Sequence, residues 1–525
     1  MSDELSFRRL LERGGTRREF LQAGGGVAGL IMLGALPGHR SDATVRTADY
    51  PFTLGVASGD PTPDGVVLWT RLAPDPLRGG GMPPLRVSVR WEIADDEGFT
   101  RMVQRGQALA IPELAHSVHV EARGLAPDRV YWYRFVSGGQ MSPVGRTRTA
   151  PAARARVDRF PLAFASCQMY QTGYYTAHRH LAEEDVNLVV FLGDYIYESG
   201  IDTAGVRRHT ESEIITLDHY RTRYSLYKMD RDLQAAHAAF PWTVTWDDHE
   251  VDNNYAGDIS ERNDVVERFL ERRAAAYQAY YEHMPLRRSY MPTGPNLRLY
   301  RRLGFGSLIE LSLLDTRQYR TDQPCGDRIS APCPETYSPA ATTLGAEQER
   351  WLFDGLGRSS ARWNLLGNQL PLAEIDRIAG PERGFQMDQW SGYVAGRDRV
   401  LRFLQERRVA NPVVITGDVH QNWVADVKVD AADPASATVA TEFVGTSISS
   451  GGDGAEMTTA GQAILTDNPH VKYFNAQRGY VRCLVTPERW QSDYRVVPFI
   501  SRPGAPVKTH ASFVVENGRP GVQTA

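Results

Sequence analysis

Five short apolar runs in the second part of the chain each end in side chains of the kinds that bind metal ions. Segments with apolar residues near i, i+3 and i+4 separate them, so this order predicts β-strands alternating with α-helices. In sheets of this kind ligands bind at the carboxyl edge of the strands. The runs end as follows: "PLAFASC" in Cys167, "NLVVFLGDYIY" in Asp194 with Tyr197 three residues on, "WTVTWDDHE" in Asp247, Asp248 and His249, "RWNLLGNQ" in Asn368 and Gln369, and "NPVVITGDVH" in Asp418 and His420.

Each of these motifs alone has an ordinary structural explanation. A Gly-Asp pair after a strand is common in turns, because Gly adopts positive φ and Asp accepts hydrogen bonds from the backbone. A single Cys after a strand is usually a buried small side chain. Asp248 and His249 alone would suit a helix cap. The inference therefore rests on five strand ends together, which favour a metal site.

The ligand types indicate more than one kind of metal ion. Carboxylates, an amide oxygen and a phenolate are hard donors that suit Ca²⁺, Mn²⁺, Mg²⁺ or Fe³⁺. Cys167 and His420 are softer donors and favour a transition metal. We therefore expect one transition metal with harder ions that share Asp194. Two metals about 3.5–4 Å apart are the usual arrangement for displacement at phosphorus.

Residues from about 50 to 149 show another pattern, which predicts short β-strands. "DGVVLWTRL", "LRVSVRWEIA" and "RVYWYRFVSG" alternate apolar and polar residues between Gly, Pro or Asp boundaries. Pro127 followed by Tyr131 and Tyr133 matches the tyrosine corner of immunoglobulin-like sandwiches. We expect an immunoglobulin-like β-sandwich over residues 46–155 and an α/β domain over residues 156–525.

The amino terminus has the pattern of an export signal. Arg17 and Arg18 precede an apolar segment, residues 23–36, that is shorter than the about 20 residues a membrane span requires. Arg-Arg followed by Glu-Phe-Leu matches the twin-arginine pattern. The alternative is an amphipathic first helix, which three consecutive glycines at 24–26 disfavour. We expect residues 1–45 to be a signal read by the twin-arginine machinery, and the protein to be periplasmic, at the cell surface or secreted.

Charge and cysteine content limit the other partners. A net charge of −4 provides no general attraction for nucleic acid or anionic lipid. Membrane contact would then come only from an uncleaved signal or a lipid substrate. In an oxidising compartment, Cys325 and Cys333 in one polar loop are candidates for a local disulfide, a pairing that the sequence leaves open.

The order Cys…GDxxY…DDHE…GNQ…GDVH resembles the calcineurin-like metallophosphoesterases, and within them the PhoD-type alkaline phosphatases and their phospholipase D relatives. "FASCQ", "LDTRQYR" and "FVGTSISS" are further matches. Cys167, Asp248 and Asp418 replace the Asp, Asn and His of the wider superfamily, and all three replacements match the PhoD-type subset. The resemblance implies an α+β, four-layer αββα sandwich preceded by an immunoglobulin-like β-sandwich.

The resemblance also implies roles for single residues. His249 would act on the substrate as a catalytic residue beside Asp248, and Arg317 and Arg478 would contact phosphate or brace loops. The expected cofactors are Fe³⁺ and Ca²⁺, with Zn, Mn or Mg as alternatives. Asp194 would bridge the two kinds of ion. The iron ligands would be Cys167, Asp194, Tyr197 and His420, and the calcium ligands Asp248, Asn368 and Asp418.

The leading functional hypothesis is an exported phosphoesterase that hydrolyses phosphate monoesters, diesters or both by attack of a metal-bound hydroxide. A second hypothesis keeps this site but assigns it to a phospholipase D-like phosphodiesterase acting on lipids or wall polymers. A third, from another class, is a surface polymer-binding protein with structural calcium.

Overall fold

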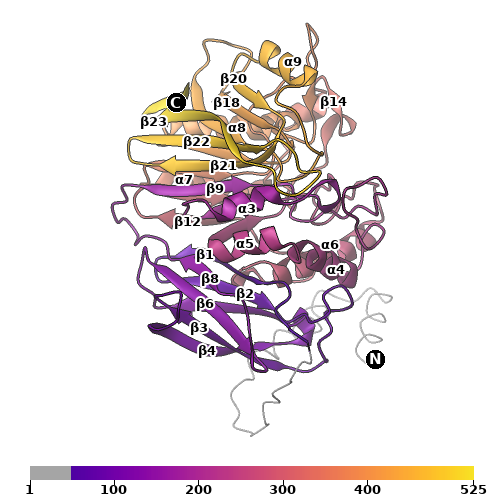
Figure 1. Cartoon of the computed structure of the whole chain (residues 1–525). Helices are drawn as coiled ribbons and strands as arrows, with labels where there is room; N and C mark the ends of the chain where they lie inside the picture. The colour runs from indigo at the N-terminus through magenta and orange to yellow at the C-terminus, as the bar shows by residue number, and fades with distance from the viewer. Residues whose placement is uncertain (1–48) are drawn as a thin grey trace, which may run out of the picture. The chain divides into compact units, whose positions relative to one another are not determined.

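Two large β-sheets pack face to face in residues 49–525, which are the part of the chain that this computed structural model describes (Figure 1). The predicted signal, residues 1–45, lies outside the described residues. The first sheet has ten strands in the order β24 (Arg519–Thr524), β23 (Lys508–Glu516), β22 (Arg489–Val497), β21 (Arg478–Val485), β9 (Phe160–Ala165), β10 (Val189–Leu192), β11 (Pro241–Thr245), β1 (Val56–Thr62), β2 (Gly65–Arg71) and β5 (Ser117–Arg123). The second has seven, in the order β12 (Arg301–Phe305), β13 (Ile309–Leu313), β15 (Trp363–Gly367), β17 (Pro412–Thr416), β19 (Thr438–Val444), β18 (Asn422–Lys428) and β20 (Val471–Asn475).

The central strands are apolar throughout because both of their faces are buried. On β10, Val190 and Leu192 pack in the core between the two sheets. Val189 and Phe191 of the same strand point the other way, into a core shared with helices. This alternation follows from the two-residue period of a strand. Parallel strands covered on both faces therefore read as continuous hydrophobic runs, as the sequence does here.

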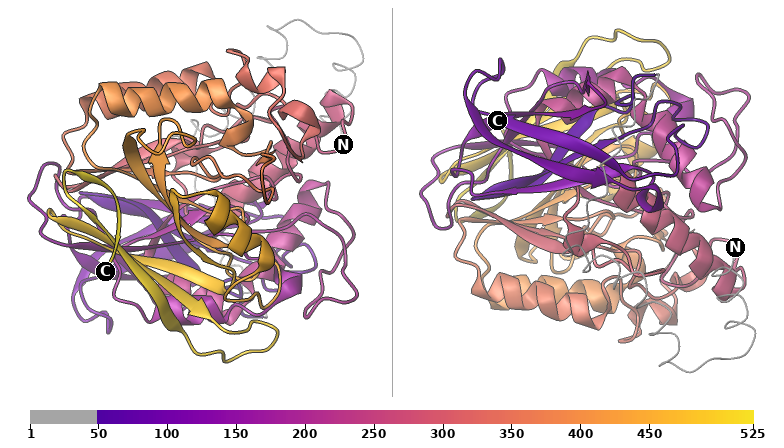
Figure 2. Two further views of the ribbon diagram at one scale, coloured as in Figure 1. Left: turned by 90° about the horizontal axis from the view of Figure 1, so that it is seen from above. Right: turned by 90° about the horizontal axis from the view of Figure 1, so that it is seen from below.

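Helices cover the outer face of each sheet. Those packed on the ten-stranded sheet are α3 (Thr176–Ala182), α4 (Leu217–Lys228), α5 (Arg231–Ala239) and α6 (Val266–His283). Those packed on the seven-stranded sheet are α7 (Gly345–Arg358), α8 (Val394–Glu406) and α9 (Thr459–Asp467). Figure 2 shows α7 and α8 side by side, and the stacked rings of Phe353 and Phe403, 4.4 Å apart, join them. The predicted four-layer αββα arrangement is confirmed. Among the helices of residues 49–525, none combines the length and the apolar character that a membrane span needs.

The predicted β-sandwich is present, but it is not a separate pair of sheets. Its second sheet consists of β4 (Met102–Ala110), β3 (Val87–Ala94), β6 (Val130–Ser137), β7 (Gln140–Met141) and β8 (Gly145–Arg148). This sheet packs on β1, β2 and β5 through a shared apolar core. The Tyr131 hydroxyl accepts a hydrogen bond from the Ala126 N–H (2.9 Å), as a tyrosine corner requires. However, Ser58 and Gly59 of β1 pair in parallel with β11, so one sheet of the sandwich continues the ten-stranded sheet. The domain boundary at residue 155 stays a prediction.

The candidate disulfide of the polar loop is present in the structure. Cys325 and Cys333 are bonded to each other, whereas Cys167 and Cys483 are free and buried. The short strand β14 (Ile329–Ser330) lies inside the closed loop and pairs with β16 (Phe385–Gln386). The disulfide is worth roughly 2–3 kcal/mol for a loop of this length, by restricting the unfolded chain.

Candidate metal centre

The carboxyl ends of the central strands bring the predicted side chains to one edge of the two sheets. β9, β10 and β11 are parallel neighbours in the first sheet, and β15 and β17 are parallel neighbours in the second. Each predicted run forms a strand that ends one to three residues before its first predicted metal ligand. The two sheets join at this edge, where Ser166 after β9 bridges to Ser447 after β19.

Four of the predicted ligands have left-handed backbone conformations. The φ angles are 59° for Cys167, 56° for Asp194, 66° for Asp418 and 55° for His420. Residues other than glycine pay a conformational cost in this region, roughly 1–2 kcal/mol each. Such strain persists where the surrounding structure fixes it, and it clusters at functional sites. Three of these four residues, Cys167, Asp194 and His420, bring their ligand atoms together.

The first group of side chains matches the predicted transition-metal ligands. The ligand atoms of Cys167, Asp194 and His420 all lie within 4.8 Å of one another. The Tyr197 hydroxyl donates to Asp194 Oδ2 (2.8 Å) and lies 3.1 Å from His420 Nε2. Ser450 donates to the same hydroxyl (2.7 Å). A thiol, a carboxylate, an imidazole and a phenol thus converge, as the sequence predicted.

A second group shares Asp194 with the first. Ligand atoms of Asp194, Asp248 and His249 also lie within 4.8 Å of one another. Within residues 49–525, the buried Oδ1 atoms of Asp194 and Asp248 have no hydrogen-bond partner, and the Arg317 guanidinium lies 3.5 Å from Asp248 Oδ1. A buried carboxylate oxygen without a partner is costly, so these two oxygens are suited to a cation. The donor set therefore fits bound cations.

Asn368 and Asp418 lie at the same edge, with partners of their own. Asn368 Oδ1 accepts a hydrogen bond from Trp390 Nε1 (3.2 Å), and its amide nitrogen donates to the Leu370 carbonyl. Asp418 belongs to neither group of converging ligand atoms, and Gln389 Nε2 lies 3.4 Å from its Oδ2. Their assignment to calcium stays a prediction.

Burial and charge set the protonation of the two histidines in opposite directions. Burial lowers the pKa of His420 to about 3, so this imidazole is neutral and has a lone pair for a metal. Burial also opposes charge on His249, but the carboxylates of Glu198, Asp248 and Asp194 outweigh it and raise the pKa well above the usual value. Glu198 Oε2 lies 2.7 Å from His249 Nδ1. His249 is therefore a candidate proton donor.

The carboxylates of Asp194 and Asp418 are crowded in a way that a cation would relieve. Burial raises the pKa of both well above the usual range, and the neighbouring carboxylates Asp248 and Asp247 add to it. Burial likewise raises the pKa of the Cys167 thiol, and Asp194 adds to this effect. A metal ion reverses this balance, because it stabilises carboxylate and thiolate directly.

Three carboxylates at the site, Glu250, Glu198 and Asp388, form hydrogen bonds with other protein groups. Glu250 accepts hydrogen bonds from the N–H groups of Asp194 (3.1 Å) and Asp247 (2.8 Å), so it fixes two strand ends relative to each other. Sequence reasoning did not single out Glu198 or Asp388. Asp388 follows the two-residue strand β16, in a segment with no periodic pattern, so no sequence signal marked it.

The two predicted phosphate-binding arginines are engaged in protein contacts. Arg317 is fully buried and donates to Asp247 Oδ1 (2.5 Å) and Asp388 Oδ1 (2.9 Å). Arg478 donates to the carbonyls of His420 (2.8 Å) and Ser450 (2.6 Å). These contacts favour a bracing role, and direct contact with phosphate stays a prediction for both.

Comparison with known families shows which family this chain belongs to. The sequence profile of the PhoD-like phosphatases matches residues 162–494, and the profile of the N-terminal domain of PhoD-like phosphatases matches residues 38–151. The chain belongs to the PhoD-like phosphatase family. A PhoD-like relative, alkaline phosphatase D of Bacillus subtilis (strain 168), is 52% identical over 516 residues, which are 97% of this chain and 88% of the relative.

Solved structures agree with the assignment to the PhoD-like family. The structure of PhoD superposes with a TM-score of 0.90 at 53% identity, covering 91% of this chain and 93% of the other. A purple acid phosphatase from yellow lupin (Lupinus luteus) seeds superposes with a TM-score of 0.56 at 12% identity, covering 89% and 74%. At 12% identity, the second match shows a likeness of fold alone.

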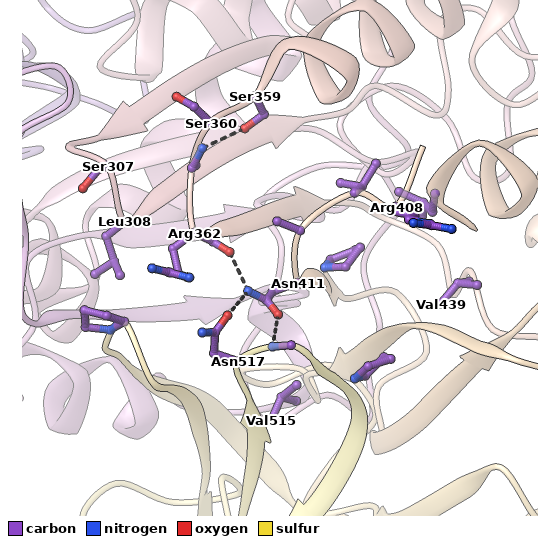
Figure 3. A pocket seen from close by; sticks show the side chains of 18 of the residues that line it. Ser307, Leu308, Ser359, Ser360, Arg362, Arg408, Asn411, Val439, Val515 and Asn517 are labelled. Atoms are coloured by element: carbon purple, nitrogen blue, oxygen red, sulfur yellow. Dashed lines mark hydrogen bonds between the residues drawn. The ribbon is translucent and has the colours of Figure 1, made fainter. Parts of the chain in front are cut away.

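A separate cavity of about 1000 Å³ lies at the opposite, amino-terminal ends of the strands. Figure 3 shows Asn411 in its centre, donating to the Arg362 carbonyl (2.7 Å) and to Asn517 Oδ1 (2.7 Å). Arg362 directly precedes β15 and Asn411 directly precedes β17. The metal-ligand groups lie at the other ends of these strands, so this cavity is not part of the PhoD-like site.

Proposed function

We propose that the protein is a metal-dependent phosphoesterase that hydrolyses phosphate esters at the edge where the five strands end. The observation that carries this proposal is the sharing of Asp194 between two ligand groups, in which one buried oxygen each of Asp194 and Asp248 accepts no hydrogen bond from the described residues. Membership of a phosphatase family makes the chain a phosphoesterase and sets aside the alternative of a purely polymer-binding protein. The natural ester is the open part of the proposal.

The residues present fit two kinds of ion. Cys167, Asp194, Tyr197 and His420 would hold Fe³⁺, because thiolate, phenolate and imidazole donors suit a transition metal. Asp248, Asn368 and Asp418 would hold Ca²⁺, with Asp194 between the two. When bound, such ions activate water and neutralise charge on phosphoryl oxygens.

His249 would donate a proton to the leaving group. Its Nδ1 pairs with Glu198, and the ring lies 4.1 Å from the Tyr197 ring, so its orientation is fixed from two sides. Glu198, which is not among the proposed metal ligands, favours the protonated form of His249, as a general acid requires. A proton passed from His249 to the departing oxygen would avoid release of an alkoxide.

Hydrolysis by the purified protein tests this function. Chromogenic phosphate monoester and diester are compared in the presence of calcium, with wild type, Cys167→Ser and Cys483→Ser. Both cysteines are buried and free, but only Cys167 lies in the ligand group. We expect Cys167→Ser to lose activity and metal together, while Cys483→Ser retains both. Full activity in Cys167→Ser would contradict the site.

The same assay separates the two substrate classes. Faster monoester turnover supports an alkaline phosphatase, whereas faster diester turnover favours a phosphodiesterase of the phospholipase D type, acting on lipids or wall polymers.

We also propose export through residues 1–45, the predicted twin-arginine signal. Replacing Arg17 and Arg18 with lysine should retain the protein inside the cell, and unchanged export of that variant would contradict this route.

A further inference from the structure

Asn254 connects the predicted calcium ligand Asp248 to the disulfide loop. The Asn254 N–H donates to Asp248 Oδ2 (2.7 Å), and the Asn254 amide nitrogen donates to Asp327 Oδ2 (2.8 Å). Asp327 lies between Cys325 and Cys333, inside the covalently closed loop. Asp248 Oδ2 is thus held in place, while Asp248 Oδ1 accepts no hydrogen bond from the described residues.

A second connection runs from the residues just before the disulfide. Gln323 Nε2 donates to the Asn254 carbonyl (2.5 Å) and to Asp388 Oδ1 (2.8 Å). Asp388 in turn accepts a hydrogen bond from Arg317, whose guanidinium lies 3.5 Å from Asp248 Oδ1. The segment around the disulfide therefore reaches Asp248 from two directions.

The loop has backbone conformations that need external support. Cys325 and Asp327 have φ angles of 56° and 49°, and Asn254 has a φ of 50°. Non-glycine residues keep such conformations where the surroundings over-determine them. The disulfide supplies that constraint on the loop side, because an opened loop regains conformational freedom.

We propose that Asp327 is a positioning residue that acts through Asn254 to orient Asp248 for calcium, and that the Cys325–Cys333 disulfide keeps Asp327 in place. The inference rests on the calcium site of the proposed function. It predicts that calcium affinity depends on the oxidation state of a disulfide whose cysteines are not themselves ligands. Residues that orient a metal ligand typically change metal affinity 10- to 100-fold when they are removed.

Calcium titration calorimetry on the purified full chain tests the positioning role. We expect Asp327→Ala to weaken calcium binding at least about tenfold. Asp327→Asn keeps an oxygen acceptor for the Asn254 amide, so it should bind nearly as well as wild type. Asp322→Ala is the matched control, because Asp322 is an exposed carboxylate in the same segment, and among the described residues its side chain accepts a hydrogen bond only from the neighbouring Gln323 N–H.

Reduction tests the part played by the disulfide. Dithiothreitol gives its two thiol hydrogens to the sulfurs of Cys325 and Cys333 and becomes a cyclic disulfide. Reduced wild type should bind calcium as weakly as Asp327→Ala, and Asp327→Ala should lose nothing further on reduction, because coupled effects are not additive. The double variant C325S/C333S repeats this test without reductant, should Asp327→Ala fail to fold.

The outcomes separate this inference from the proposed function. Calcium binding by wild type that Asp327→Ala and reduction leave unchanged overturns the inference and leaves the phosphoesterase standing. Additive losses from Asp327→Ala and reduction overturn the link between the residue and the disulfide. Absence of calcium binding by oxidised wild type removes the calcium site and this inference with it.

Discussion

Replacing Lys228 with methionine should stabilise the protein at neutral pH. Lys228 ends α4 and is only 2% exposed, and burial lowers its pKa to about 7. Among residues 49–525 no carboxylate forms a salt bridge with it, and its ammonium instead lies 4.3 Å from the centre of the Trp69 ring and 5.3 Å from that of Tyr195. Methionine is unbranched like lysine and only one atom shorter, and it removes the charge.

The pKa difference between the folded and unfolded chain fixes the sign and size of the effect. The unfolded chain binds the proton more tightly, with a pKa of 10.5 against about 7 when folded. The destabilisation is therefore complete below about pH 7 and disappears as the pH rises toward 10.5. A difference of about 3.5 pKa units corresponds to about 5 kcal/mol, from which the two rings recover about 1–2 kcal/mol. About 3 kcal/mol remains for the variant to gain.

Urea unfolding at about pH 6.5 and about pH 10 measures this gain. We expect Lys228→Met to exceed wild type by about 3 kcal/mol at the lower pH and by much less at the higher. Lys472→Met is the control, because its side chain is 40% exposed and should change little at either pH. An equal gain for Lys228→Met at both pH values would refute the reasoning, since it would show that packing and not charge is responsible.

Three further predictions concern the site and the core. Glu198→Gln should lower kcat by roughly 10- to 100-fold with little change in KM, because Glu198 positions His249. Steady-state kinetics measures both constants, and an unchanged kcat would show that this pairing is unimportant. Tyr197→Phe should abolish visible colour in the iron-loaded protein, and a coloured variant would rule out a phenolate ligand. Leu311→Ala should cost about 2–5 kcal/mol in unfolding free energy, because Leu311 is fully buried between the two sheets; a cost below 1 kcal/mol would contradict the packing described.

The sequence predicts the strand ends of the site well because each depends on one short segment of the chain. A buried strand reads as an apolar run, and the residue after it lies at the sheet edge whatever the rest of the fold does. Cys167, Asp194, Asp248 and His420 were found in this way. Glu198 was close to such a run, but its pairing with His249 depends on how two loops meet.

Other features depend on contacts between distant segments. Asp388 follows irregular chain and reaches the site because β16 pairs with β14 in the disulfide loop. The pairing of β1 with β11 joins residues more than a hundred positions apart, and no local pattern records which strand lies beside which. The sequence therefore predicted a sandwich but not that it shares a sheet with the strands of the site.

That shared sheet has a consequence for how this protein can evolve by recombination. Exchange of the sandwich for another module at residue 155 would remove β1 and leave an unpaired edge on β11, the strand that leads into Asp248. Open edges of this kind invite pairing with other molecules. A successful exchange would need a donor that brings its own strand in the same parallel register. The sandwich and the two large sheets should therefore be inherited together, and recombination should preserve their order along the chain.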